Sequence, residues 1–196
     1  MKAPVSGGKT STPQSEYIPS GKTVGIVSKI IDLGTHLKKS KEFGDKMKRQ
    51  IRIEFELPQI KRVFNEEKGE QTAMYGKDYV FSMHEKAALA SLCSEIMWKT
   101  VDEDFDIDTM IWKYCVIKFE HTKSWEDTRV NIFSISDMDD EETEKAIAKG
   151  IVAENPQVVF SLDTFDQKKY ESLPERLQKK IALSPEYTKS IEDLPF

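Results

Sequence analysis

Two polar segments of the chain place basic side chains close to an aromatic one, a combination that suits unpaired nucleic acid. Lysines crowd the segment from Gly34 to Met47, and the segment from His121 to Thr128 holds Lys123 and Trp125. Lysine and arginine attract phosphates, and an aromatic ring is a platform on which any base can stack. With neighbours on the expected strands, the predicted contact residues are Lys38, Lys39, Lys41, Lys46, Lys48, Arg49, Arg52, Tyr75, Lys77, Tyr79, Phe81, Lys123, Trp125 and Arg129.

Several of these side chains have a structural alternative that the sequence leaves open. Trp125 is flanked by polar residues, so we interpret it as a stacking residue, although it could fold back onto the rim of the domain. Tyr79 and Phe81 share one face of an expected strand, where core packing and base stacking are equally good accounts. Arg52 lies on the polar side of another strand, where it could contact a phosphate or carry ordinary surface charge.

Patterns that would support catalysis or metal binding are incomplete. The acidic run from Asp102 to Asp108 could hold metal ions in a nuclease, but it lacks the glycine and the spacing of a calcium loop. The segment Gly8–Ser11 resembles the end of a phosphate-binding loop without its first glycine. The histidines are scattered without metal-ligand spacing, at His36, His84 and His121. We therefore expect no enzyme, no metal and no cofactor, and we interpret the acidic run as a solvated loop.

The chain ends in an acidic tip that could dock on a partner protein. Its residues are Glu192, Asp193, Leu194, Pro195 and Phe196. A terminal phenylalanine offers its carboxylate to a basic residue and its ring to an apolar pocket, while the acids steer it toward a basic rim. We therefore predict that these residues recruit partner proteins.

Charge is distributed unevenly along the 196 residues, whose net charge is −5. From Gly21 to Arg62 there are 11 basic and 5 acidic residues, a balance of +6. From Asp137 to Phe196 there are 8 basic and 14 acidic residues, a balance of −6. The basic front is compatible with nucleic-acid binding although the total charge is negative.

Cysteine use and hydropathy indicate a soluble protein of a reducing compartment. Cys93 and Cys115 lie inside apolar periodic segments, so we expect both to be free core residues. The N-terminal residues are rich in Ser, Thr, Gly, Pro and Lys and lack an apolar run, so we expect a flexible arm and no signal peptide or membrane anchor.

The spacing of apolar residues predicts five short strands. They are expected at Lys22–Leu33, Lys48–Leu57, Tyr75–Met83, Met110–Glu120 and Arg129–Ser136. Strand 48–57 alternates apolar with charged residues, which predicts one buried face and one wet face, and Pro58 is expected to end it. Phe119 and Phe133, in the last two strands, are expected in the core.

One helix is predicted between the third and fourth strands. A capping-box pattern at Ser82 and Glu85 would open it, and apolar residues recur at helical spacing to about Thr100. Five strands with a helix in this place is the order of an OB-fold, a partly open β-barrel that binds oligonucleotides. A second helix is expected after Pro174, with Pro185 ending it.

We therefore predict a mainly β protein built on a five-stranded OB-fold barrel, with a C-terminal helical extension and flexible tails. The expected divisions are a flexible arm at 1–20, an OB-fold DNA-binding domain at 21–137, an acidic linker with a helical extension at 138–184, and a flexible acidic docking tail at 185–196.

Four stretches of the sequence resemble a family of tailed-bacteriophage proteins. They are IIDLGTH at 30–36, IRIEFELP at 51–58, YVFSMHEKAALASL at 79–92 and FDQKKYESLPERLQKKIALSPEY at 165–187. That family is characterised by an Ile-Asp-Leu-Gly-Thr motif near the end of its first strand and is associated with single-stranded DNA binding through an OB-fold. Many relatives carry a tryptophan in the second-strand segment where this chain has Glu54-Phe55, a departure at one possible base platform.

The tip is similar to that of bacterial single-stranded DNA-binding proteins, which recruit replication, recombination and repair partners through it. The two resemblances imply a protein that binds single-stranded DNA with little sequence preference and recruits phage or host replication and recombination proteins. They also imply the cytoplasm of an infected bacterial host and a loop after the first strand shaped by Asp32, Gly34 and Thr35. The helical extension could pack on the barrel or pair with another chain, so a homo-oligomer is possible. The alternative is a protein–protein adaptor of such a complex that does not bind DNA itself.

Overall fold

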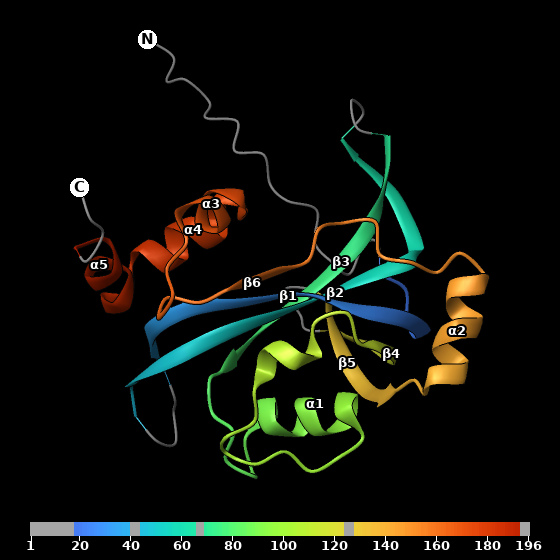
Figure 1. Ribbon diagram of the computed structural model, residues 1–196, viewed down its shortest axis with the longest axis horizontal. Helices are drawn as coiled ribbons and strands as arrows, with labels where there is room; N and C mark the ends of the chain where they lie inside the picture. Colours follow the sequence, from blue (N-terminus) through green and yellow to red (C-terminus); the bar gives the residue numbers. More distant parts are fainter. Residues whose placement is uncertain (1–17, 40–43, 66–68, 124–127, 193–196) are drawn as a thin grey trace.

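The computed structural model describes residues 18–39, 44–65, 69–123 and 128–192. Figure 1 shows strands crossing the middle of the molecule, with α1 on one side and the C-terminal helices on the other. In chain order the elements are β1 (Gly21–Lys38), β2 (Lys46–Asn65), β3 (Gly69–Val80), α1 (Ala88–Met97), the 3-10 helix η2 (Ile107–Met110), β4 (Tyr114–Lys123), β5 (Thr128–Asp137), α2 (Asp140–Ala148), β6 (Val158–Phe160), α3 (Gln167–Ser172), α4 (Glu175–Ala182) and α5 (Pro185–Glu192).

One mixed sheet holds all six described strands. The first five pair in the order β3-β2-β1-β4-β5, each antiparallel to its neighbour, and the short strand β6 pairs with β1 in parallel. The prediction of a mainly β fold is confirmed. Among the described residues no backbone pairing joins β3 to β5, so the sheet is not a closed barrel.

Side chains bridge the opening between β3 and β5. Helix α1 packs against both strands, and the ring of Tyr75 on β3 lies 4.9 Å from that of Phe119 on β4. Burial raises the pKa of Tyr75, although the backbone of Ile132 on β5 opposes this shift. Because these contacts exclude water from the inner face, the curved sheet can bury one core without a complete ring of backbone hydrogen bonds.

The inner face of the sheet and α1 share the main hydrophobic core. The alternation on β2 is confirmed for its apolar half, since Ile51, Ile53, Phe55 and Leu57 are buried. Cys93 and Cys115 are buried and free, as expected, and burial raises the pKa of the Cys93 thiol to about 12. The predicted start of α1 is wrong: it begins after Ala87 without a side-chain cap, so Ser82 and Glu85 form no capping box.

Strands β2 and β3 are longer than the sequence predicted. A register shift between Leu57 and Lys61 accommodates Pro58, after which β2 continues to Asn65 and pairs with the start of β3. A bulge of this kind removes the need for the backbone N–H that proline lacks. The residues that follow Pro58 therefore form one arm of a long hairpin, which extends beyond the rest of the sheet in Figure 1.

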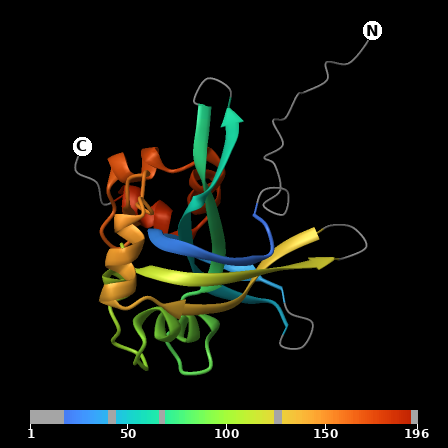
Figure 2. The same ribbon diagram turned by 90° about the vertical axis from the view of Figure 1, so that its right-hand side faces the viewer.

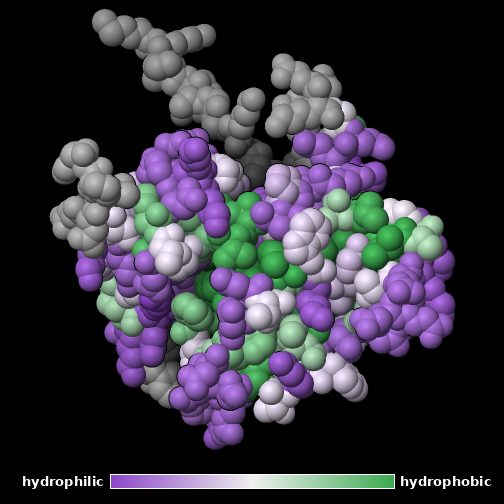
Figure 3. Space-filling model, in the orientation of Figure 1, coloured by the Kyte–Doolittle hydropathy of each residue, from purple (hydrophilic) through white to green (hydrophobic). Residues whose placement is uncertain are grey.

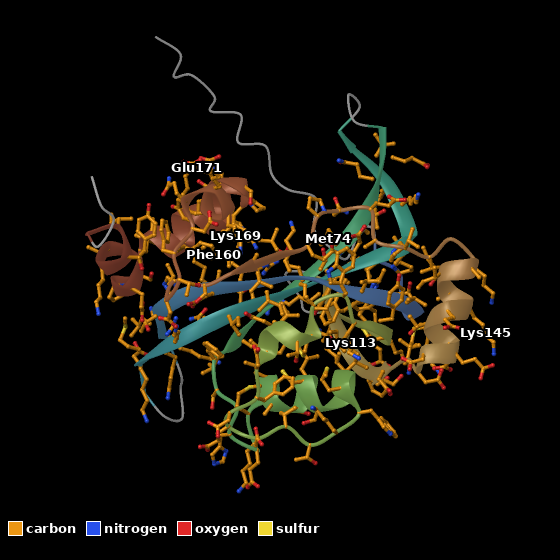
Figure 4. The ribbon with its side chains drawn as sticks, in the orientation of Figure 1. Met74, Lys113, Lys145, Phe160, Lys169 and Glu171 are labelled. Carbon is orange, nitrogen blue, oxygen red and sulfur yellow. The ribbon has the colours of Figure 1, made fainter. Side chains whose placement is uncertain are left out.

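The outer face of β1, β2 and β3 is covered by residues 149–192, here called the C-terminal extension. A second apolar cluster joins Ile31 and Leu33 of β1 to side chains of the extension, namely Phe160, Leu162, Tyr170, Leu173, Leu177 and Ile181. Figure 4 shows Phe160 on β6 close to Lys169 of α3, whose Nζ donates to the Val159 carbonyl at 3.1 Å. The predicted helix after Pro174 is confirmed as α4.

Two expectations about the charged face of β2 and about the tail are wrong. Arg52, Glu54 and Glu56 are only 8%, 7% and 0% exposed, because the extension lies on the face expected to be wet. Pro185 begins α5 instead of leading into an irregular tail, so residues 185–192 are helical. No helix among the described residues has the length and hydropathy needed to cross a membrane.

Candidate nucleic-acid interface

The hairpin between β1 and β2 carries the largest group of predicted phosphate-binding lysines. Lys38 lies opposite Lys46 and His36 opposite Lys48, so cations of both strands gather near its end. The side chains of Lys38, Lys39, Lys46 and Lys48 are exposed and form no ion pair with another described residue. Lys41, a further predicted contact, lies outside the described residues.

Cations also flank the end of the β4–β5 hairpin. Lys123 lies opposite Thr128 and Thr122 opposite Arg129, and both Lys123 and Arg129 are exposed. Trp125 lies outside the described residues. In Figure 2 the strand ends of both hairpins lie toward the right, whereas in Figure 1 the β1–β2 hairpin ends at the far left, away from β4 and β5. Because β4 pairs with the first residues of β1, Gly21–Ile26, and Lys38 is the last residue of β1, the two groups of predicted contact residues border opposite ends of this strand.

Arg49 is already neutralised by carboxylates of the protein. Its Nη2 lies 2.5 Å from Asp32 Oδ2 and 2.8 Å from Asp163 Oδ2, and its guanidinium lies 5.7 Å from the centre of the Phe81 ring. The hydrogen bond to Asp32 raises the pKa of Arg49 further above its already high value. Asp32 Oδ2 also accepts the N–H of Leu162 at 3.2 Å, so this cluster ties β1 and β2 to the C-terminal extension.

Arg52 is part of a buried charge network and cannot reach a phosphate in this structure. Its Nε lies 2.6 Å from Glu54 and its Nη1 2.6 Å from Asp78, while Lys180 of α4 lies 2.8 Å from the same Asp78. Lys29 of β1 completes the network at 3.6 Å from Glu54. Paired charges of opposite sign explain how the polar half of β2 can be covered by protein.

The predicted aromatic contacts divide between core and surface. Tyr75 and Tyr79 are 2% and 8% exposed in the main core, so for them the core alternative holds in this structure. Phe81 is 37% exposed and lines an open hollow of about 300 Å³ with Ser82, Met83, His84 and Glu103. Lys77 is exposed, with its Nζ 5.5 Å from the centre of the Tyr79 ring.

One exposed aromatic on the β4–β5 side was not predicted. Phe133 was expected in the core, but it is 61% exposed, with Lys118 Nζ 4.1 Å from its ring centre. The sequence pattern failed because a register shift in the β4–β5 pairing changes the phase of alternation at this residue. Phe119 is only 1% exposed, so the core prediction is confirmed there.

Gly34 and Thr35, expected to shape the loop after the first strand, also hold α5 against β1. Gly34 has a φ of +76°, and a Cβ at this position would lie 2.3 Å from Ser184. Thr35 donates its backbone N–H to Glu186 at 2.9 Å and its hydroxyl to the same carboxylate. The predicted docking tip thus follows directly from a helix anchored on β1. Glu192 is the last residue of that helix, and Asp193, Leu194, Pro195 and Phe196 lie outside the described residues.

The described residues contain no group of three or more His, Cys, Asp or Glu side chains arranged to hold a metal ion. The acidic run from Asp102 to Asp108 includes the start of η2, where Asp106 caps the 3-10 helix by accepting the N–H of Asp108. Comparison of the sequence with models of known protein families gives no match, and a search of curated proteins finds no similar one.

Proposed function

We propose that the protein binds single-stranded DNA with little sequence preference. The observation that carries the proposal is the set of exposed lysines and arginine, free of ion pairs to other described residues, at the ends of the β1–β2 and β4–β5 hairpins. Such cations attract the phosphates of any sequence alike, because the backbone charge does not depend on the bases.

The strand order supports an OB-fold that is open between β3 and β5. The order β3-β2-β1-β4-β5 is a ring of five strands opened at one place, and α1 lies in the chain between β3 and β4. In OB-folds the loops after the first and fourth strands flank the oligonucleotide site. The cations named above border these two loops, which favours the same use of the fold here.

The acidic tip is proposed to recruit replication or recombination proteins of the phage or the host. Helix α5 is fixed on β1 by the Thr35–Glu186 contacts, so Glu192, the first residue of the tip, ends a helix that is packed on the protein. This supports a tip that stays attached to the DNA-binding part of the molecule while it recruits a partner.

A titration of fluorescently labelled oligo-dT, followed by anisotropy at low salt, tests the proposed function. We expect saturable binding, and weaker binding to a duplex of the same length, because stacking on aromatic side chains needs unpaired bases. Incubation of the same oligonucleotide with magnesium should leave it intact. Absence of binding at the lowest salt concentration would reject the proposal.

A second candidate, the adaptor without direct DNA binding, is favoured by two exposed tryptophans. Trp98 and Trp112 are 77% and 56% exposed and adopt positive φ angles of 47° and 71°. Exposed tryptophans are frequent anchors of protein interfaces. If oligo-dT does not bind, replacing these two residues by alanine should abolish capture of the partner; if it does bind, the replacements should leave DNA affinity unchanged.

A further inference from the structure

The outer face of β4 and β5 presents an aromatic ring where a regular strand would have buried it. Lys118 of β4 lies opposite Ser134 of β5, whereas the next residue, Phe119, lies opposite Ile132. Phe133 is therefore the extra residue of a bulge, and 61% of it is exposed. Bulges commonly redirect a side chain toward a ligand.

One basic side chain contacts this ring, and others lie on the same two strands and on neighbouring β1. The ammonium of Lys118 lies 4.1 Å from the ring centre, so one part of the ring already contacts a cation. Lys22 of β1 lies directly opposite Lys118, on the same face of the sheet. Further along the hairpin, Lys123 and Arg129 are exposed. One acid, Glu120, pairs with Lys118 at 3.4 Å, which leaves a net positive surface among these described residues.

A hollow adjoins the same cations on the β1 side. Its volume is about 200 Å³, and it is lined by backbone and side chains at the start of β1 and by two residues of β2, namely Pro19, Ser20, Gly21, Lys22, Thr23, Gln59 and Ile60. Lys22 lines this hollow and lies opposite Lys118. An extended ligand that crosses the sheet from Phe133 to the hollow would therefore pass both ammonium groups.

The opposite part of the sheet offers no comparable surface. The outer face of β1, β2 and β3 is occupied by the C-terminal extension, and its cations Arg49 and Arg52 are paired with carboxylates. The face turned to the viewer in Figure 3 shows mainly hydrophilic residues over α2 and the C-terminal helices, with hydrophobic residues over the strands between them. Among the four described rings that have a cation over them, Phe133 has the shortest distance to its cation and the greatest exposure.

We infer that Phe133 is a stacking platform for an unpaired nucleobase, and that Lys22 and Lys118 bind the adjoining phosphates. Charge complementarity selects nucleic acid as the occupant, because an apolar protein partner would leave these ammonium groups desolvated without an anion. The inference rests on the proposed function and moves the base-binding surface from the β2–β3 face to the face of β1, β4 and β5.

The test compares Phe133→Ala with the wild type on two labelled probes of equal length, oligo-dT and an abasic oligonucleotide. A lost stacking contact should weaken oligo-dT binding by about 5- to 100-fold, while binding to the abasic probe, which has phosphates only, should stay within about twofold. Phe133→Tyr should restore oligo-dT binding because it keeps the ring. Trp98→Ala, which removes another exposed aromatic, is the matched control and should bind both probes like the wild type.

Failure of this inference is distinguishable from failure of the proposed function. If the wild type binds oligo-dT and Phe133→Ala binds it equally well, the platform is wrong and the function stands. Equal weakening on both probes would also overturn the platform, because a general loss of structure or charge does not depend on the bases. If the wild type binds neither probe, the proposed function itself fails. Circular dichroism of each variant shows whether it is folded.

Discussion

Gly34 shows how a single residue allows β1 to pack against the segment that leads into α5. Its φ of +76° belongs to the region that glycine occupies without strain, and the missing side chain makes room for Ser184 at the start of α5. The neighbouring Thr35 then donates two hydrogen bonds to Glu186. Residues that resemble a strand motif in the sequence therefore act as an attachment point for the C-terminal extension.

Replacing Gly34 by alanine should destabilise the protein more than the same change at Gly150. Gly150 has a similar φ of +78°, but nothing lies within 4 Å of its would-be Cβ, so it isolates the cost of backbone conformation. That cost is about 1–2 kcal/mol, and the clash with Ser184 adds about 1–3 kcal/mol at Gly34 only. Urea unfolding of both variants gives the comparison, and equal losses would contradict the proposed packing of α5.

At the residue scale, the sequence predicted the exposure of the loop lysines correctly but misplaced two residues whose burial depends on other parts of the chain. Lys38, Lys46 and Lys123 are exposed, as their polar surroundings suggested. Arg52 was misplaced because its exposure depends on a segment more than 100 residues further on, where Lys180 shares Asp78 with it. Phe133 was misplaced because a bulge depends on the partner strand, which a periodicity within one strand cannot reveal.

Strand β2 shows the same contrast at the scale of elements. Its alternation predicted the strand and its buried apolar half correctly, since that signal is local. The charged side chains of β2 could face either solvent or another protein segment that supplies opposite charges, and the alternation in the sequence is identical in both cases. Here Glu56 accepts the backbone N–H of Glu154 at 2.7 Å and the side chain of Asn155 at 2.9 Å, which fixes the cover in place.

The docking of α4 and α5 should weaken at acid pH. Burial would raise the pKa values of Asp78 and Glu186, but hydrogen bonds outweigh it, from Lys180 and Arg52 to Asp78 and from Thr35 to Glu186. Both pKa values therefore lie below their ordinary values of 3.8 and 4.5. Lowered carboxyl pKa values contribute stability that is complete above these ordinary values and is lost as the pH falls through the folded ones.

Hydrogen exchange of the α5 amides, measured as the pH is lowered through this range and corrected for the intrinsic rate, checks the expectation. Protection should fall in α5 before it falls in β2, which lies between two strands. Glu186→Gln should reduce the protection of α5 already at neutral pH and make it less dependent on pH. Unchanged protection of α5 in this variant would show that the Thr35 contacts do not hold the helix.

For the molecule as a whole, part of the acidic C-terminal segment pairs with the basic front, since Asp163 lies 2.8 Å from Arg49 and Glu154 2.7 Å from Lys61. Unpaired lysines of the basic front gather at the β1–β2 hairpin, and Lys22 at the start of β1 also has no ion pair among the described residues. Lys29 and Lys61, in contrast, are paired with carboxylates. The sequence predicted the polarity from residue counts, but it could not separate paired from unpaired cations. Only the unpaired ones are available to release counterions from DNA.

The salt dependence of oligo-dT binding tests the central claim most directly when it is compared between two variants of equal net charge. In the first variant, glutamine replaces the hairpin lysines Lys38, Lys39, Lys46 and Lys48. In the second, glutamine replaces four exposed lysines in or next to helices α2, α3 and α4, namely Lys145, Lys149, Lys168 and Lys179. The account predicts that the slope of log K against log salt becomes shallower by about 0.7 for each hairpin lysine that contacts a phosphate, up to about 3 in total, and stays unchanged in the second variant. Equal slopes in the wild type and both variants would contradict it.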